Sequence, residues 1–470
     1  MKAQPATKSY VFDKGYKDVK NVMKKTWEYA FRPVKNESKR LKRVFGLNFI
    51  WGSLTFLCDV IMFTIITLAI LTINLILSTL FIATVFIIGV FVYLFYSILW
   101  LADSIFSVLK GISSHCSICQ NKFNLPYYKC PKCGQIHTIL RPSVYGILKR
   151  KCLCGNKIPT TFFNGRGKLE AVCPVCGELV KDGGQHSEKM IPIVGGPSSG
   201  KTCFINMAIT ELEKVAGNYN LDFKYSPLED DKYEENSRYM ARGMLPQKTS
   251  DTRLKYYQFY LTNKGAKVKN LVNLCDVAGE VYAEGDDMNK QIGYKFADAF
   301  LMVLDPLSIS KFRRELNGKI DFYRYAASML PIDEALSKLI TTLENMKCLN
   351  SKNMLKTDVV VVFGKCDIPS LDQKIGKIAV NKYMNDHVGV TEYQAQNEVC
   401  ENFLLEYEEG NFLNSLKSKF RSIQFFTCSA LGHVQNGAKF KPYNLADPLL
   451  WIIDKVYPSI NLKDKWGKKI

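Results

Sequence analysis

Hydrophobic and polar positions follow three different patterns along the chain, and the first is a long apolar stretch. Residues 47–102 carry a single charge, at Asp59, and are otherwise apolar or weakly polar. Because a membrane-spanning helix needs about 20 apolar residues, this length predicts two helices, at 49–72 and 77–101, joined by a tight turn near Asn74. We therefore expect a transmembrane helical hairpin over 47–109. A buried hairpin of a soluble core is the alternative, although such helices are usually shorter.

The segment before this stretch is basic and periodic. Residues 1–46 contain thirteen Lys or Arg and four Asp or Glu, a net charge of +9. Apolar residues recur at three- and four-residue spacing from Tyr16 to Phe31, until Pro33 ends the pattern. This predicts a basic amphipathic helix on the membrane surface, or one packed on the protein's own globular part. Positive charge flanking a hairpin predicts that both ends are cytoplasmic.

A third pattern begins near residue 188, where short apolar runs alternate with polar and helical segments. Such alternation is typical of an α/β domain with a mostly parallel sheet. We expect this domain to cover 188–458, followed by a basic tail at 459–470. The expected strands are 190–194, 253–261, 268–275, 299–304, 358–363 and 423–426, and a final helix is expected at 445–456.

Charge and cysteine content narrow the class of protein. The formal net charge of +19 predicts an acidic partner, and the position of the basic segment beside the apolar stretch favours lipid headgroups over nucleic acid. Eight of the fifteen cysteines lie in close pairs between Cys116 and Cys176, which is metal-ligand spacing and not a secreted disulfide framework. No secretory signal precedes them. We expect a reducing, cytosolic environment.

The paired cysteines predict a double zinc-ribbon module over 113–180. Zinc at structural sites is tetrahedral and prefers thiolates, and each short knuckle supplies two. Two sites of four cysteines follow, grouped in chain order: Cys116, Cys119, Cys130 and Cys133 form the first, and Cys152, Cys154, Cys173 and Cys176 form the second. His115 and His137 are expected to be non-ligands.

The role of the module is expected to be structural or protein-docking. Nucleic-acid binding stays an alternative, because five basic residues accompany the second group, although no aromatic stacking pattern does. These residues are Lys149, Arg150, Lys151, Arg166 and Lys168.

A phosphate-binding loop follows the first strand of the α/β domain. It has the pattern G-x4-G-K-[ST] and comprises Gly195, Gly196, Pro197, Ser198, Ser199, Gly200, Lys201 and Thr202. Glycines let the backbone N–H groups turn towards phosphates, and the helix N-terminus adds a favourable dipole. We expect Lys201 to neutralise the β- and γ-phosphates and Thr202 to ligate Mg²⁺.

A second motif, D-x-x-G, ends the strand at 268–275. Asp276 is expected to hold Mg²⁺ through water, and Gly279 to offer its N–H to the γ-phosphate. Glu280 follows this glycine directly and is expected to act as a base or to position water. Thr249 is the favoured hydroxyl of the first switch, with Thr252 as the alternative. Cysteines beside the motifs, namely Cys203, Cys275, Cys366 and Cys428, are interpreted as small space-filling residues, with a redox switch as the alternative.

The last two strands run into Gly364-Lys-Cys-Asp367 and Thr427-Cys-Ser-Ala-Leu431. This order of motifs resembles the Ras-like, translation-factor-related GTPases, and in particular the bacterial double-GTPases of biological-conflict systems. The resemblance implies that Asp367 binds the guanine N1–H and amine, that Lys365 packs along the base, and that Ala430, with Ser429 beside it, contacts the guanine O6. The usual motif is [NT]-K-x-D, so Gly364 is a departure that leaves ATP open.

Together these features predict a membrane-anchored GTPase with GTP, Mg²⁺ and two Zn²⁺ as cofactors, acting as a conformational switch on a protein effector. A P-loop ATPase with the same phosphate site is one alternative. The other is a membrane scaffold in which the nucleotide is structural and the zinc ribbons recruit a partner. Oligomerisation stays open.

Overall fold

The computed structural model describes eight stretches of the chain, which form two compact units. The described residues are 4–44, 51–180, 186–226, 231–246, 255–276, 292–433, 439–462 and 465–466. The helical unit comprises Met1–Leu109 and Tyr127–Val172, and the P-loop unit comprises Lys110–Pro126 and Cys173–Ile470. The predicted zinc module is thus divided between the two units.

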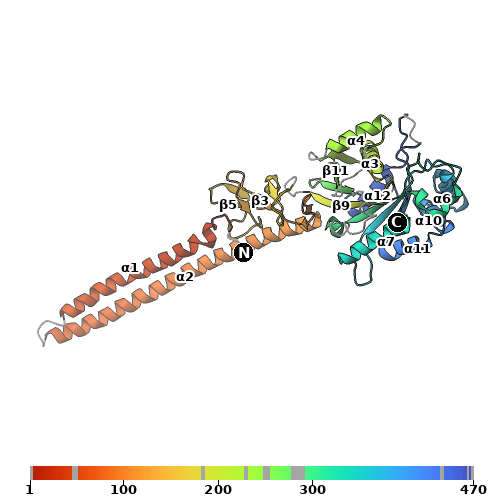
Figure 1. Ribbon diagram of the computed structural model, residues 1–470. Helices are drawn as coiled ribbons and strands as arrows, with labels where there is room; N and C mark the ends of the chain where they lie inside the picture. The colour runs from red at the N-terminus through yellow and green to blue at the C-terminus, as the bar shows by residue number, and fades with distance from the viewer. Residues whose placement is uncertain are drawn as a thin grey trace. The chain divides into compact units, whose positions relative to one another are not determined.

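Two long helices dominate the helical unit (Figure 1). A short 3-10 turn, η1 (Tyr10–Phe12), precedes α1 (Lys14–Val44), and α2 (Trp51–Leu109) follows. α2 has 59 residues and is therefore about 90 Å long. By length and composition it is the one described helix that could cross a membrane.

The continuity of α2 corrects the prediction of a tight turn near residues 74–79. Asn74 Nδ2 donates to the Ile70 carbonyl at 2.9 Å, and Thr79 Oγ1 donates to the Ile76 carbonyl at 2.8 Å. Polar side chains that bond to the carbonyls of the preceding turn are compatible with a helix, and no Gly or Pro interrupts this one between 74 and 79. The two predicted helices are therefore one helix.

α1 packs antiparallel along α2. The rings of Phe12 and Tyr93 meet edge to face at 5.3 Å near one end, and Arg40 lies 4.0 Å from the Asp59 carboxylate near the other. Asp59 therefore has a partner within the chain. The predicted helix end at Pro33 is wrong, because α1 continues through this proline to Val44, where packing along α2 offsets the hydrogen bond that Pro33 cannot donate.

The remainder of the helical unit is built from short strands. β3 (Tyr127–Lys129) pairs antiparallel with both β4 (Ile136–His137) and β7 (Ala171–Val172), and β5 (Lys149–Lys151) pairs with β6 (Lys157–Pro159). Ala6 forms a β-bridge with Cys152, so the N-terminal residues are part of this small fold.

A buried ion pair joins this small fold to α2. Arg166, in the 3-10 turn η2 (Arg166–Lys168), donates from Nη1 to Asp103 Oδ2 at 2.8 Å, and both side chains are buried. The same nitrogen donates to the carbonyls of Leu140 and Thr160. Arg150 is also buried and bonds to the Ile139 carbonyl. Two of the five cations considered for nucleic-acid binding are thus enclosed in the fold.

The P-loop unit contains a seven-stranded sheet with the order β10-β11-β12-β9-β13-β14-β15. Its strands are β9 (Ser187–Val194), β10 (Leu221–Tyr225), β11 (Lys255–Asn263), β12 (Asn270–Asp276), β13 (Ala299–Leu304), β14 (Asp358–Phe363) and β15 (Ile423–Thr427). β11 runs antiparallel to both of its neighbours, β10 and β12. The other four pairs, β12–β9, β9–β13, β13–β14 and β14–β15, are parallel. The predicted α/β class with a mostly parallel sheet is confirmed.

Helices cover both faces of this sheet (Figure 1). α3 (Lys201–Ala216) and α12 (Ala446–Val456) pack with Ile191, Leu301 and Val360 in one core. α6 (Ser310–Glu315), α7 (Ile332–Asn345), α10 (Glu392–Glu406) and α11 (Gly410–Lys419) contribute to a second core with the opposite strand positions. The remaining elements are β1 (Ser114–His115), β2 (Lys122–Phe123), β8 (Leu179–Val180), α4 (Asp231–Ala241), α8 (Leu371–Lys374) and α9 (Lys377–Asp386), with short 3-10 turns η4 (Gly217–Tyr219), η6 (Ile292–Phe296) and η7 (Pro306–Ser308).

The C-terminal residues predicted as a basic tail belong partly to the core. Ile460, Leu462 and Trp466 are buried with α3 and α12. Trp466 Nε1 donates to Asp454 Oδ2 at 3.1 Å. The described part of this segment therefore continues the P-loop unit, because its apolar side chains complete the core.

We expect Arg166→Leu to destabilise the helical unit by about 3–5 kcal/mol, because it leaves the buried Asp103 carboxylate without its cation. Denaturant unfolding of the full-length protein in detergent would measure this. Lys168→Leu is the matched control, since Lys168 is exposed on the same turn and should change stability little. Equal stability of both variants would contradict the role given to the ion pair.

Candidate functional site

The P-loop follows β9 and is held close to the neighbouring strand. A Cβ atom on Gly195 would lie 2.3 Å from the Val303 carbonyl oxygen, so only glycine fits there. Gly200 has a φ of +94°, a left-handed conformation that glycine adopts without strain, and α3 begins directly after it. Pro197, Ser198 and the buried Ser199 complete the turn between them.

Lys201 and Thr202 lie at the start of α3, as the motif predicts. Lys201 Nζ donates to the carbonyls of Gly195 at 2.8 Å and Gly196 at 3.0 Å, so the ammonium group is inside the loop. Thr202 Oγ1 donates to Asp276 Oδ2 at 3.2 Å. The Thr202 hydroxyl at the start of α3 and the Asp276 carboxylate at the end of β12 are oxygen ligands of the kind that Mg²⁺ prefers, so these residues fit the predicted ion.

The residues predicted to contact the base come together at the ends of β14 and β15. Ser429 Oγ donates to Asp367 Oδ1 at 2.6 Å and accepts the Gly432 N–H at 2.7 Å, which fixes the carboxylate. Lys365 Nζ donates to the P-loop carbonyl of Ser198 at 2.9 Å. Ala430 follows Ser429 in the same loop.

Three predicted residues lie outside the described part of the chain: Thr249, Gly279 and Glu280. Thr252, the alternative to Thr249, lies outside it as well. Their roles stay predictions.

Sequence reasoning missed Asp305, which follows β13. Its Oδ2 atom accepts from Lys365 Nζ at 2.6 Å and from the Ser328 N–H at 2.7 Å. An acidic residue directly after a buried strand, between two nucleotide motifs, was a signal for this position. Its partners come from distant segments that spacing along the chain does not connect.

The four cysteines beside the motifs are poor candidates for a redox switch. Burial raises the pKa of Cys203 to about 11, and it raises the pKa values of Cys275, Cys366 and Cys428 well above the ordinary thiol value. Because the thiolate is the reactive form, these thiols are inert near neutral pH. This agrees with their interpretation as space-filling residues.

The eight paired cysteines form two groups of four that fit zinc. Within each group the sulfur atoms lie within 4.8 Å of one another, and the distances between knuckles are 3.5 Å for Cys116–Cys176 and 3.7 Å for Cys130–Cys154. A tetrahedral zinc with Zn–S bonds of about 2.3 Å places its sulfurs about 3.8 Å apart. Neither His115 nor His137 belongs to a group of the described residues.

The grouping in chain order is wrong. The outer site consists of Cys116, Cys119, Cys173 and Cys176, and the inner site consists of Cys130, Cys133, Cys152 and Cys154. The cause is the antiparallel pairing of β3 with β7, in which Tyr127 lies opposite Val172. Cys173 follows Val172 and so lies beside the start of β3, where the chain arrives from Cys116 and Cys119, whereas Cys130 follows the other end of β3. Cys173 therefore groups with the first cysteine pair of the chain, and Cys130 groups with Cys152 and Cys154.

A buried carboxylate connects the outer site to the sheet. Glu188 on β9 accepts the His115 N–H at 2.8 Å and the Asn273 side-chain amide at 3.1 Å. Burial opposes ionisation of Glu188, but the hydrogen bond from His186 and the nearby His115 hold the pKa of the carboxyl below its usual value. Burial lowers the pKa of His115.

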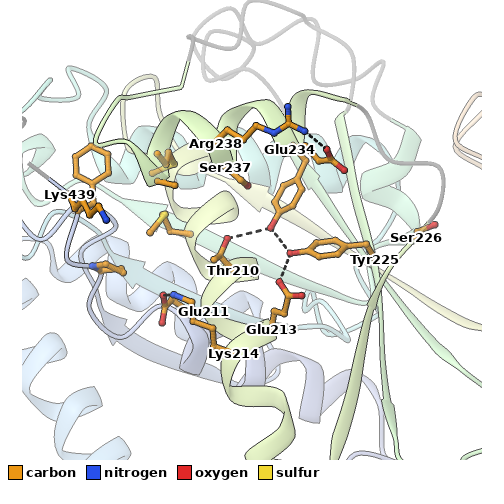
Figure 2. Close-up of a pocket in the computed structure, with 16 residues that line it drawn as sticks. Thr210, Glu211, Glu213, Lys214, Tyr225, Ser226, Glu234, Ser237, Arg238 and Lys439 are labelled. Atoms are coloured by element: carbon orange, nitrogen blue, oxygen red, sulfur yellow. Dashed lines mark hydrogen bonds and ion pairs between the residues drawn. The ribbon is translucent and has the colours of Figure 1, made fainter. Parts of the chain in front are cut away.

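A separate cavity of about 940 Å³ lies between α3 and α4 (Figure 2). Tyr225 donates to Glu213 at 2.9 Å and lies 3.0 Å from the Tyr233 hydroxyl, which is 3.5 Å from Thr210. The charged side chains Lys214 and Arg238 around it are paired with carboxylates of their own helices. Within the described part of the chain, no residue predicted for the nucleotide site lines this cavity.

We expect paired substitutions to distinguish nested from sequential zinc sites. Cys119→Ser with Cys173→Ser damages only the outer site and should leave one zinc per chain, whereas Cys119→Ser with Cys130→Ser damages both and should leave none. Elemental analysis of the purified full-length variants gives the count. Sequential grouping requires the opposite result: no zinc in Cys119→Ser with Cys173→Ser, and one zinc per chain in Cys119→Ser with Cys130→Ser.

Comparison with known proteins gives one family. Residues 189–415 match the family model described as Double-GTPase 2. No curated protein matches the chain. Among solved structures, the GDP-bound RocCORdC fragment of Roco2 from Methanosarcina barkeri has 10% identity and a TM-score of 0.24, with 58% of this chain and 51% of that chain covered. The chain thus spans about half of that structure. Residues 189–415 are therefore similar to the double-GTPase family, over slightly less than half of the chain.

Proposed function

We propose that this chain is a membrane-anchored, Mg²⁺-dependent GTPase that acts as a conformational switch. The observation that carries the proposal is the meeting of Lys201, the Thr202–Asp276 pair and the Asp367–Ser429 pair at one edge of the sheet. The first two groups suit a triphosphate with its metal, and the third suits a base with two N–H donors.

Each group has a defined task in this mechanism. Lys201 would leave the Gly195 and Gly196 carbonyls to bind the β- and γ-phosphates, and the Thr202 hydroxyl and Asp276 carboxylate would hold the metal ion. Bound Mg²⁺ neutralises charge that develops on the phosphates. Asp367, oriented by Ser429, accepts hydrogen bonds from the guanine. Glu280 positions or deprotonates the attacking water, and Thr249 and Gly279 sense the γ-phosphate.

We propose that the conformational change on hydrolysis reaches a protein effector through the Cys116–Cys119 knuckle of the outer zinc site. Gln120 Oε1 accepts the Gly293 N–H at 2.7 Å, and Lys122 Nζ lies 3.0 Å from Asp298. Gly293 and Asp298 follow the segment that begins with the D-x-x-G motif. A change in this segment on hydrolysis would therefore reach the knuckle and alter the surface offered to a protein effector. The family resemblance supports a role in bacterial conflict.

Membrane anchoring is proposed from α2. Large apolar side chains are exposed along it, such as Ile73, Phe86 and Phe91, and residues 60–102 carry no charge. Lipid would cover this surface. The bridge between Ala6 and Cys152 supports a placement of the N-terminal residues and the inner zinc site on the same side of the membrane. Eight metal-binding thiols favour the reducing cytoplasm.

We expect Asp367→Asn to reduce GTP affinity about 10- to 100-fold, because two hydrogen bonds to a charged acceptor are lost, while ATP affinity changes little. Calorimetric titration of the full-length, zinc-loaded protein with non-hydrolysable analogues measures both. Asp386→Asn is the control, since Asp386 is exposed on α9. Tighter binding of ATP than GTP by the wild type would favour the ATPase, and bound GTP without turnover would favour the scaffold.

We expect Ile73→Lys combined with Phe91→Lys to abolish alkali-resistant membrane association. The pair divides the uncharged stretch into runs of 13, 17 and 11 residues, each shorter than the about 20 needed to span a bilayer. Val108→Lys with Leu109→Lys is the control, because it leaves the stretch intact beside Lys110. Unchanged flotation of the first variant with liposomes would refute the anchor.

A further inference from the structure

We propose that Asp305 is a positioning residue of the nucleotide site, whose buried carboxylate holds Lys365 against the P-loop and replaces the side chain that Gly364 lacks. The inference rests on the proposed nucleotide function and extends it, since it assigns the residue that compensates for the departure from [NT]-K-x-D.

The carboxylate of Asp305 is fully enclosed and satisfied on both oxygens. Its side chain is 0% exposed. Oδ1 accepts the Leu307 N–H at 2.9 Å, which caps the following 3-10 turn, while Oδ2 accepts from Lys365 Nζ at 2.6 Å and from the Ser328 N–H at 2.7 Å. A charge-assisted bond in a dry environment is stronger than a surface ion pair.

Lys365 is held at three points. Its ammonium group donates to Asp305 Oδ2, to the Ser198 carbonyl at 2.9 Å and to the Ala326 carbonyl at 2.9 Å. An ammonium group has three donors, so these acceptors use all of them. The three acceptors come from the end of β13, the P-loop and the segment between α6 and α7, which contains Ala326 and Ser328. The lysine thus joins the base-binding loop to the phosphate-binding loop, and Asp305 is the charged group among these three acceptors.

Gly364 explains why such a link is needed. A Cβ atom there would lie 3.6 Å from the carbonyl oxygens of Ser199 and Leu304, which is ordinary contact distance. A hydrogen-bonding side chain at this position would therefore reach the P-loop at Ser199. Glycine cannot make that connection, so the contact between the two loops depends on the Lys365–Asp305 pair.

Asp305 also holds the segment between α6 and α7 against the P-loop. By accepting the Ser328 N–H it holds a segment so close that a Cβ on Gly196 would lie 3.1 Å from Ser328 Oγ. The conformation of Gly196 and the position of Lys365 are therefore fixed by the same carboxylate. Loss of Asp305 should weaken binding of phosphates and base together.

The primary test is Asp305→Asn in the full-length protein in detergent. Asparagine has one acceptor oxygen, so it cannot serve Leu307, Ser328 and Lys365 at once. We expect affinity for GTP analogues to fall about tenfold or more. Asp358→Asn is the matched control: Asp358 is buried and paired with Arg421, but at the start of β14, away from the site. Its nucleotide affinity should equal that of the wild type. Affinity unchanged in Asp305→Asn would overturn the proposal.

Gly364→Asn provides a rescue that a merely structural role would not produce. In the Asp305→Asn background it should restore most of the lost affinity, because the new amide reaches Ser199, and a double variant as weak as Asp305→Asn would overturn the proposal. In the wild-type background it should change affinity less than about threefold, since the loops are already joined. A gain in nucleotide affinity of about tenfold or more from Gly364→Asn alone would overturn the proposal, even if Asp305→Asn does not fold.

Titration with both GTP and ATP analogues separates this proposal from the proposed function. Equal binding of the two by the wild type would refute guanine selectivity, yet Asp305→Asn would still have to weaken both, because the P-loop is affected. Guanine-selective binding that Asp305→Asn leaves intact would refute only the role of Asp305.

Discussion

The site depends on one constraint, the alignment of five parallel strand ends at a single edge of the sheet. β9 lies between β12 and β13, and its last residue leads into the P-loop, while the neighbouring ends carry Asp276 and Asp305. Nearly every position of these strands is buried on both faces. A shift of one residue in register would exchange the two faces, so the cores hold the strands in place. The polar groups at this edge are therefore held in fixed positions relative to one another.

Much of the sheet could be predicted because its strands are short, continuous apolar runs. β13 and β14 have the expected bounds, and β12 and β15 differ by one or two residues. β10 was missed, because at this antiparallel edge charged and apolar residues alternate over only five positions. The single helix α2 was read as two because Asn74 looks like a turn residue in sequence, whereas its amide can bond within a helix.

The site could be predicted where its functional residues are adjacent in the sequence. It could not be predicted where residues far apart in the sequence meet only in the folded structure. Residues 195–202 form a complete phosphate motif, and the Ser429–Asp367 contact joins two recognisable loops. The division of the cysteines into sites was not predictable, since either grouping has suitable spacing and only the β3–β7 register decides between them. Asp305 could not be recognised as a partner of Lys365, because 60 residues separate them.

The nesting of the metal sites imposes an order on assembly. Cys130 and Cys154 are 24 residues apart, so the inner site can close during synthesis as soon as Cys154 has emerged, whereas the outer site must wait for Cys176. Once the inner site has closed, the loop that the outer metal must close is effectively shorter and costs less chain entropy. Loss of the outer metal would therefore leave the inner site closed, because all four of its ligands lie within residues 130–154.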